Sequence, residues 1–269
     1  MKENFEKLPF AMLIGSLVTA FISSTARCAL TVTTLDARYG VYESSSILPT
    51  LYHAFLIAAL IALAVIAFLK APSREEDYVR AHSDLTVFAS FVCAFMLIAN
   101  AGASIYYIVR NLSLPSTFDI LELCFSPLAI VYFIGLARSQ RKQRAPLALM
   151  SMFVIALCAV CLIRVYFDNS ALQVSPNKIM NELAFLSAMI YFLSEARAQL
   201  GILKHRLYLA SALTAPVLLL SSAVPNLLFP RELSIGESDN FMHYAVCVAL
   251  AIFIWARLYA YAKYKDTNE

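Results

Sequence analysis

Four ionisable side chains occur at one predicted depth in long apolar segments of the chain. They are two histidines and two glutamates, namely His53, Glu122, Glu182 and His243. Each stands 14 to 17 residues before a basic residue near the end of its segment: Lys70, Arg138, Arg197 and Arg257, respectively. At a rise of about 1.5 Å per helical residue, these spacings place the four groups within roughly 5 Å of one another in depth.

Imidazole and carboxylate groups are ligands that zinc and iron accept, so these residues raise the question of a metal site. A haem held between His53 and His243 is a second form of this hypothesis. The four residues come from four separate segments, and none of these segments has the H-x-x-H or E-x-x-H spacing that places two ligands on one helix face. We therefore assign no metal ligand from the sequence, which indicates no particular cofactor.

Basic, amide and phenol groups in the other segments favour a site for a polar or charged ligand. Charged groups inside a membrane segment cost about 2.5–3.5 kcal/mol on insertion scales, so they usually face the interior of a helix bundle or a cavity. The residues at this depth that we expect to bind a ligand are Arg27, His53, Tyr106, Glu122, Arg164, Glu182, Asn226 and His243.

Glu182 is expected to point into the bundle, close to Glu122 across an outward-opening cavity. Arg164 or Arg27 is its expected partner, because a carboxylate that faces an arginine keeps both groups charged. Asp168 competes for Arg164, since the two stand four residues apart on one helix face. The alternative is that the charged residues only pair with one another and hold the helices together.

Long apolar segments must position these residues. Of the 269 residues, 61% are hydrophobic and 14% are charged, whereas a soluble domain carries charge at about a quarter of its residues. Backbone polar groups in lipid must be paired internally, so the segments should be helices. The sequence predicts one all-α integral membrane domain, 1–269, with eight transmembrane helices of about 20 residues. Their predicted ranges are roughly 8–30, 46–69, 84–109, 117–137, 146–166, 178–197, 207–229 and 240–262.

The distribution of Lys and Arg predicts the orientation of the chain. The number of crossings depends on whether the first segment is retained. It resembles a secretory signal, but no small-x-small cleavage site follows it, so we expect an uncleaved helix. With eight crossings, 15 of the 21 basic residues, Arg257 among them, fall on the side of the two termini and four on the other side. Both termini are therefore expected in the cytoplasm, at the cell membrane. The basic stretch 137–144 has no interleaved aromatic residue, which indicates contact with lipid headgroups and no nucleic acid.

Two stretches of similar sequence indicate an internal repeat. Residues 118–140 and 178–199 share Glu-Leu, Phe, Tyr-Phe and Ala-Arg-x-Gln in the same order, with a one-residue gap between the glutamate and the tyrosine. This alignment pairs Glu122 with Glu182 and Arg138 with Arg197. We therefore predict parallel two-helix hairpin repeats at about 82–142, 144–204 and 205–266, after a less similar first pair at about 5–77.

The six cysteines all fall in the apolar segments, and Cys158 and Cys161 form a C-x-x-C in the middle of the fifth. A redox or metal-binding C-x-x-C needs a second pair of ligands or polar surroundings. Neither is visible in the sequence, so we expect the cysteines to be small buried hydrophobic residues.

The function that these patterns favour is a non-enzymatic one. We expect a receptor-like or accessory membrane subunit with an outward-facing polar pocket for a small polar or charged ligand, and with a membrane or cytoplasmic protein partner. A small-solute or ion transporter is the first alternative, although the six glycines are few for helices that slide or break during transport. A membrane-embedded, metal-dependent enzyme that uses the histidines and glutamates is the second alternative.

Overall fold

The computed structural model describes residues 8–36, 40–43, 45–71, 83–111, 115–138, 145–168, 172, 175–233 and 241–268. Within these ranges, eight helices are long and apolar enough to cross a membrane. They are α2 (Leu8–Thr33), α3 (Leu48–Lys70), α4 (Asp84–Asn111), α5 (Thr117–Arg138), α6 (Ala145–Phe167), α7 (Pro176–Gln199), α8 (His205–Leu228) and α10 (Phe241–Asn268). The predicted all-α architecture with eight helices is confirmed, and it fits an integral membrane protein.

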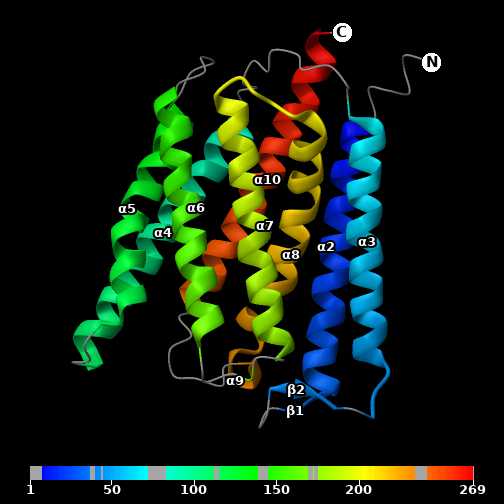
Figure 1. The fold of residues 1–269 in the computed structure, drawn as a ribbon, viewed down its shortest axis with the longest axis vertical. Helices are drawn as coiled ribbons and strands as arrows, with labels where there is room; N and C mark the ends of the chain where they lie inside the picture. Colours follow the sequence, from blue (N-terminus) through cyan, green and yellow to red (C-terminus); the bar gives the residue numbers. More distant parts are fainter. Residues whose placement is uncertain are drawn as a thin grey trace.

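Three short elements lie at one end of the bundle (Figure 1). The strands β1 (Leu35–Asp36) and β2 (Val41–Tyr42) form an antiparallel pair between α2 and α3. The single turn α9 (Pro230–Leu233) lies between α8 and α10. We call this the hairpin end. The start of α2 and the end of α10 lie at the opposite end, which we call the termini end.

Helix α8 lies at the centre of the bundle and contacts α2, α3, α7 and α10. Helices α4, α5 and α6 lie on one side of this centre, and α2 and α3 lie on the other (Figure 1). With the exception of α3 and α4, consecutive long helices are neighbours: α4 contacts α5, α6 contacts α7 and α8 contacts α10. The polar residues of the hairpin end therefore come from helices that are neighbours in space.

Local sequence signals set several helix ends. Pro176 occupies the first turn of α7, where the missing N–H of proline leaves no hydrogen bond unmade. Gly201 follows this helix with a φ of 79°, a left-handed conformation that glycine adopts without strain. At the start of α5, Ser116 Oγ accepts the Asp119 backbone N–H at 3.2 Å, and Asp119 Oδ2 accepts the Ser116 N–H at 3.0 Å. This reciprocal cap fixes the Asp119 carboxylate beside the bundle.

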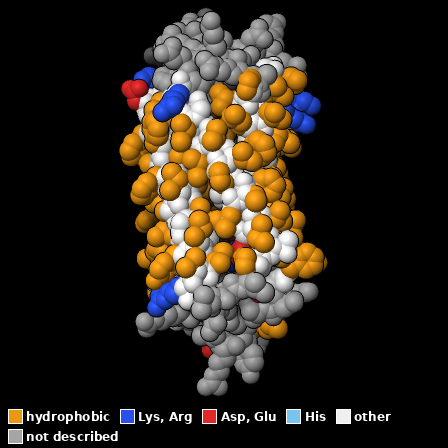
Figure 2. Space-filling view, turned by 90° about the vertical axis from the view of Figure 1, so that its left-hand side faces the viewer, with side chains coloured by type: hydrophobic (Ala, Val, Ile, Leu, Met, Phe, Trp, Pro, Cys, Tyr) orange, Lys and Arg blue, Asp and Glu red, His pale blue; other side chains and the backbone are white. Residues whose placement is uncertain are grey.

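The outward faces of the helices are apolar. Figure 2 shows hydrophobic side chains over most of one face, with Lys and Arg near its two ends. Large apolar residues such as Phe21, Leu69 and Phe95 are exposed, and so is Cys124, contrary to the expectation that every cysteine is buried. A soluble protein rarely exposes so large an apolar surface, which fits contact with lipid.

Candidate functional site: two polar clusters at the hairpin end

The first cluster, which we call the carboxylate cluster, surrounds Glu122 of α5. Arg164 Nη1 of α6 lies 3.1 Å from both Glu122 Oε2 and Asp119 Oδ1. Asn100 of α4 donates its amide N–H to Glu122 Oε1 at 2.7 Å, and His243 Nδ1 of α10 lies 3.8 Å from the same oxygen. Four helices therefore converge on a carboxylate that is only 4% exposed.

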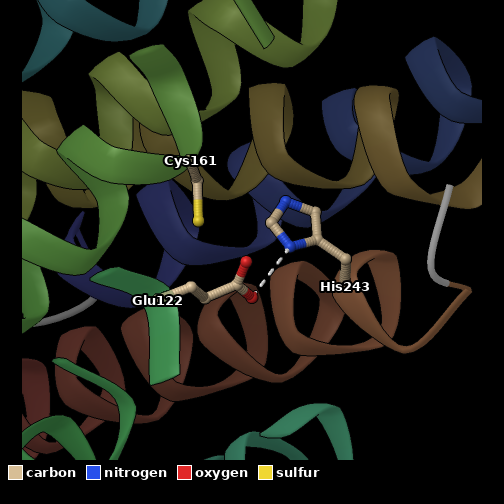
Figure 3. Close-up of side chains that lie close together, drawn as sticks. All are labelled: Glu122, Cys161 and His243. Carbon is tan, nitrogen blue, oxygen red and sulfur yellow. Dashed lines mark ion pairs between the residues drawn. The ribbon is translucent and has the colours of Figure 1, made fainter. Parts of the chain in front are cut away.

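Cys161 of α6 also belongs to this cluster. The ligand atoms of Glu122, Cys161 and His243 all lie within 4.8 Å of one another. Figure 3 shows the three side chains extending from separate helices toward a common space. An oxygen, a sulfur and a nitrogen ligand are a set that could hold a metal ion. Sequence analysis missed Cys161, although its position one helical turn before Arg164 places the two residues on the same face.

The second cluster, which we call the arginine cluster, surrounds Arg27 of α2. Arg27 is 1% exposed. Its Nη1 donates to the Ser221 carbonyl oxygen and its Nη2 donates to Asn177 Oδ1 at 2.8 Å. Its Nε is buried without a hydrogen-bond partner. Among the described residues, no carboxylate lies within ion-pair distance of Arg27.

Amide and phenol groups complete the arginine cluster. Asn177 and Asn226 exchange hydrogen bonds through their side-chain amides, at 3.0 and 2.9 Å. Tyr42 of β2 lies beside Arg27; burial raises the pKa of its phenol, and the Arg27 guanidinium acts in the opposite direction. Three groups that can donate or accept hydrogen bonds therefore surround a buried cation.

Side chains of α7 and α8 connect the two clusters. Asn181 of α7 donates to Tyr244 OH at 3.3 Å and accepts a hydrogen bond from Ser222 Oγ of α8. Tyr244 follows His243 in the chain, and the His243 ring lies 5.1 Å from the ring of Phe185 on α7. The polar groups thus form one layer across the hairpin end of the bundle.

The structure brings together five of the eight predicted site residues. Glu122, Arg164 and His243 share the carboxylate cluster, and Arg27 and Asn226 share the arginine cluster. Of the remaining three predicted residues, Tyr106 and Glu182 lie outside both clusters, and His53 lies at the edge of the arginine cluster, where its ring centroid is 6.3 Å from that of Tyr42.

His53 contacts the arginine cluster through the ring of Tyr42, and Tyr106 belongs to neither cluster. The Nδ1 of His53 lies 2.6 Å from the carbonyl oxygen of Pro49, and its ring packs against Tyr52. His53 is not one of the three potential metal ligands. Tyr106 is 56% exposed, and Arg110 stacks on its ring at 5.9 Å. Tyr106 therefore faces outward, since equal depth alone does not place residues on the same face of a helix.

Glu182 does not pair with either arginine. It is half-buried, and within the described part of the chain it forms no ion pair. Arg164 forms ion pairs with Asp119 and Glu122 instead. Consecutive residues of a helix point about 100° apart, so the buried Asn181 turns Glu182 away from the interior.

An alignment without a gap explains this error. Tyr132 and Phe133 of α5 and Tyr191 and Phe192 of α7 are fully buried and stand 59 residues apart. The same offset aligns Glu122 with Asn181, and both are buried. The one-residue gap that matched the two glutamates therefore shifted α7 onto the wrong face.

A buried ion pair lies toward the termini end. Glu195 Oε1 of α7 lies 2.7 Å from Arg257 Nη2 of α10, and their side chains are 0% and 1% exposed. Gln199 donates to Glu195 Oε1 at 3.3 Å and to Tyr132 OH at 3.0 Å. Arg257 is therefore buried inside the bundle. The count of basic residues that predicted the orientation had treated it as a charge of the loop region. Glu195 could have been found from its spacing, since it stands 14 residues, or two heptads, after Asn181 on the same stripe of α7.

Comparisons with models of known protein families, with curated proteins and with solved structures find no match to this chain. The chemistry of the two clusters therefore carries the functional inference.

Proposed function

We propose that the protein is a receptor-like or accessory integral membrane protein, without enzymatic activity, that binds a small carboxylate or similar oxyanion at Arg27. The observation that carries this proposal is the buried guanidinium of Arg27, whose partners among the described residues are all neutral: a carbonyl oxygen, an amide oxygen and the phenol of Tyr42. A buried charge is costly unless an opposite charge compensates it. A bound anion would supply that charge.

The geometry of the guanidinium favours a carboxylate or an oxyanion of similar size. Arginine has five N–H donors in a planar fork that matches two oxygens of one anion. Ser221 and Asn177 take two of these donors, and the buried Nε–H has no partner. The amides of Asn177 and Asn226 offer neutral hydrogen bonds to a polar group elsewhere on the ligand.

The same groups favour binding over catalysis. A guanidinium, amides and hydroxyls orient an anion, whereas covalent or acid–base chemistry requires an activated nucleophile or a group that titrates near neutral pH. We further propose that a membrane or cytoplasmic protein partner responds to the bound ligand.

The proposal includes an orientation. Eight crossings of the cell membrane with both termini in the cytoplasm would place the hairpin end outside, so that a ligand reaches Arg27 from the outer side. The excess of basic residues on the side of the termini supports this orientation, and it persists after Arg257 is removed from the count.

We also propose that 82–142, 144–204 and 205–266 are repeats of one helical hairpin. The contacts within the helix pairs α4–α5, α6–α7 and α8–α10 support this. The buried Tyr-Phe pairs of α5 and α7, which match without a gap, support it further. In a duplicated hairpin, Asn181 and Glu122 would be equivalent positions that now serve different clusters.

Ligand binding can be tested on the purified protein in detergent. Thermal unfolding is measured with small monocarboxylates, dicarboxylates and inorganic phosphate, first on the wild type and then on Arg27→Gln. At least one of these anions should raise the unfolding temperature in a saturable way, and Arg27→Gln should weaken its binding by tenfold or more. Arg110→Gln is the matched control, because Arg110 is exposed at the same end of the bundle, and it should keep wild-type affinity.

Two results would contradict the proposal. Either no anion of the panel stabilises the wild type, or Arg27→Gln binds as tightly as the wild type. Uptake of the bound anion into vesicles that contain the protein would assign the site to a transporter instead of a receptor.

The stability of Arg27→Gln without ligand separates a binding site from a structural contact. At a ligand site, the substitution removes an uncompensated buried charge together with two hydrogen bonds, so the net loss of stability should be about 1 kcal/mol or less. If Arg27 instead served a buried charge pair, the loss should reach about 3–5 kcal/mol. Denaturation in anion-depleted detergent solution gives this value.

A further inference from the structure

Three potential metal ligands meet in the carboxylate cluster. Glu122, Cys161 and His243 come from α5, α6 and α10, and their ligand atoms lie within 4.8 Å of one another. In Figure 3 the sulfur, the carboxylate and the imidazole face a common space. We propose that these residues bind a divalent ion of the Zn²⁺ type and leave a fourth coordination position open. This site shares no residue with the anion site at Arg27 and does not depend on it.

The ligand types select the class of metal. A thiolate, an imidazole and a carboxylate suit Zn²⁺, whereas Mg²⁺ and Ca²⁺ are bound through oxygen atoms. Three protein ligands with an open fourth position are typical of zinc sites that bind a water or a small ligand. The ligand atoms must approach one another by about 1 Å to reach zinc-bound distances. Rotation of the Cys161 and His243 side chains can supply that movement.

Two neighbouring side chains fix the position of the Glu122 carboxylate, as is usual for a carboxylate that binds a metal ion. Arg164 contacts Oε2 at 3.1 Å, and Asn100 donates to Oε1 at 2.7 Å. A carboxylate oxygen has two lone pairs, so Oε1 can accept from Asn100 and still face the metal ion. Such outer hydrogen bonds orient ligating carboxylates and are themselves important for affinity.

The charge of the cluster also favours a divalent cation. Asp119 and Glu122 carry two negative charges, and Arg164 carries one positive charge. When Cys161 binds a metal ion, its thiol releases a proton to water and becomes a thiolate. The three negative groups are then balanced by Arg164 and one divalent cation.

Cobalt serves as the probe, because Co²⁺ occupies zinc sites and absorbs light. Titration of the purified wild-type protein with Co²⁺ should produce a thiolate-to-cobalt charge-transfer band together with the d–d bands of a tetrahedral ion, and Zn²⁺ should displace them at one equivalent per chain. Cys161→Ser should abolish the charge-transfer band, and His243→Gln should weaken binding by tenfold or more. Cys124→Ser, which removes an exposed thiol of α5, should keep the wild-type spectrum.

The wild-type titration alone can overturn the proposal, whether or not the variants fold. A folded wild-type protein that gives no thiolate band with Co²⁺ has no metal site that includes Cys161. A band that persists in Cys161→Ser would come from another thiol and would overturn the assigned ligands. Elemental analysis of the protein dialysed against Zn²⁺ should give one zinc per chain in the wild type and a clear loss in both ligand variants.

Discussion

The most deeply buried ion pair among the described residues joins Glu195 and Arg257. Tyr191 and Gln199 of α7 also donate to the Glu195 carboxylate, at 3.5 and 3.3 Å. A pair of this kind adds little to stability compared with apolar residues of similar size, yet breaking it is costly because one charge remains buried and uncompensated. We therefore expect the Glu195–Arg257 pair to fix the contact between α7 and α10 without adding much to the free energy of unfolding.

Replacement of Glu195 by Gln should lower the free energy of unfolding by about 3–5 kcal/mol, because the buried Arg257 would keep its charge after losing the Glu195 carboxylate at 2.7 Å. Chemical denaturation in detergent measures this change. Glu182→Gln is the matched control, since Glu182 lies on the same helix, is half-buried and forms no ion pair among the described residues. It should change stability by less than about 0.5 kcal/mol.

Removal of both charges should restore most of the lost stability. The double variant Glu195→Leu with Arg257→Met replaces the pair by apolar side chains of similar length, a change that is often neutral or stabilising. If the double variant were less stable than Glu195→Gln, the pair would contribute through its hydrogen-bond network and not through charge compensation.

Helix α7 makes polar contacts with other helices at both ends of the bundle. One stripe of this helix contains Asn177, Asn181 and Glu195, which reach the arginine cluster, Tyr244 and Arg257, respectively. The same stripe carries the buried Phe192, which stacks on Phe253 of α10 with ring centroids 6.0 Å apart. The rotation of α7 about its axis thus decides which of its polar residues face these partners.

The rotation of α7 about its axis can be tested by single substitutions at neighbouring positions. Asn181→Ala should lower the free energy of unfolding by about 1–3 kcal/mol, because the hydroxyl of Ser222 loses its buried acceptor. Leu183→Ala, on the exposed face of α7, should cost little in detergent. In a cysteine variant series, a thiol reagent should modify Glu182→Cys faster than Asn181→Cys; the reverse order would mean that α7 is rotated from the orientation described here.

On the scale of the whole molecule, the apolar surface and the distribution of Lys and Arg both fit a chain that spans a membrane. Large apolar side chains cover the outward faces of the long helices, and polar groups are buried between them. The start of α2 and the end of α10 lie together at the end opposite the β strands (Figure 1). A membrane-spanning arrangement therefore predicts that both termini lie on one side, and the positions of Lys and Arg predict that this side is the cytoplasm.

Labelling from one side of the membrane tests this orientation. Glu43 is exposed at the hairpin end, and Lys204 is exposed at the termini end. In intact cells, an impermeant thiol reagent should modify Glu43→Cys but not Lys204→Cys, which should react only after the membrane is opened. A reporter fused after Glu269 should be cytoplasmic. An external reporter, or labelling of Lys204→Cys in intact cells, would reverse the topology and place Arg27 near the cytoplasm.

The sequence alone determined the number of helices, their extents and the depth of their polar residues. Except at the C-terminal end of α10, the helix ends differ from the predicted ranges by no more than three residues. These properties follow from local physics, because an apolar segment that crosses lipid must pair its backbone groups within a helix and needs about 20 residues to do so. Depth then follows from the fixed rise per residue.

The tertiary structure decided which polar residues meet. In an apolar helix every face is hydrophobic, so the pattern that usually reveals the buried face of a soluble helix is weak. For this reason Glu182 was assigned to the wrong face of α7, Tyr106 lies outside both clusters, and Cys161 and Glu195 were missed. The pairing of Glu122 with Arg164 and His243 depends on the rotation of each helix and on its neighbours. So does the burial of Arg27, which has no carboxylate partner in the described part of the chain. Packing between helices sets both, and a one-residue shift turns a side chain by about 100°.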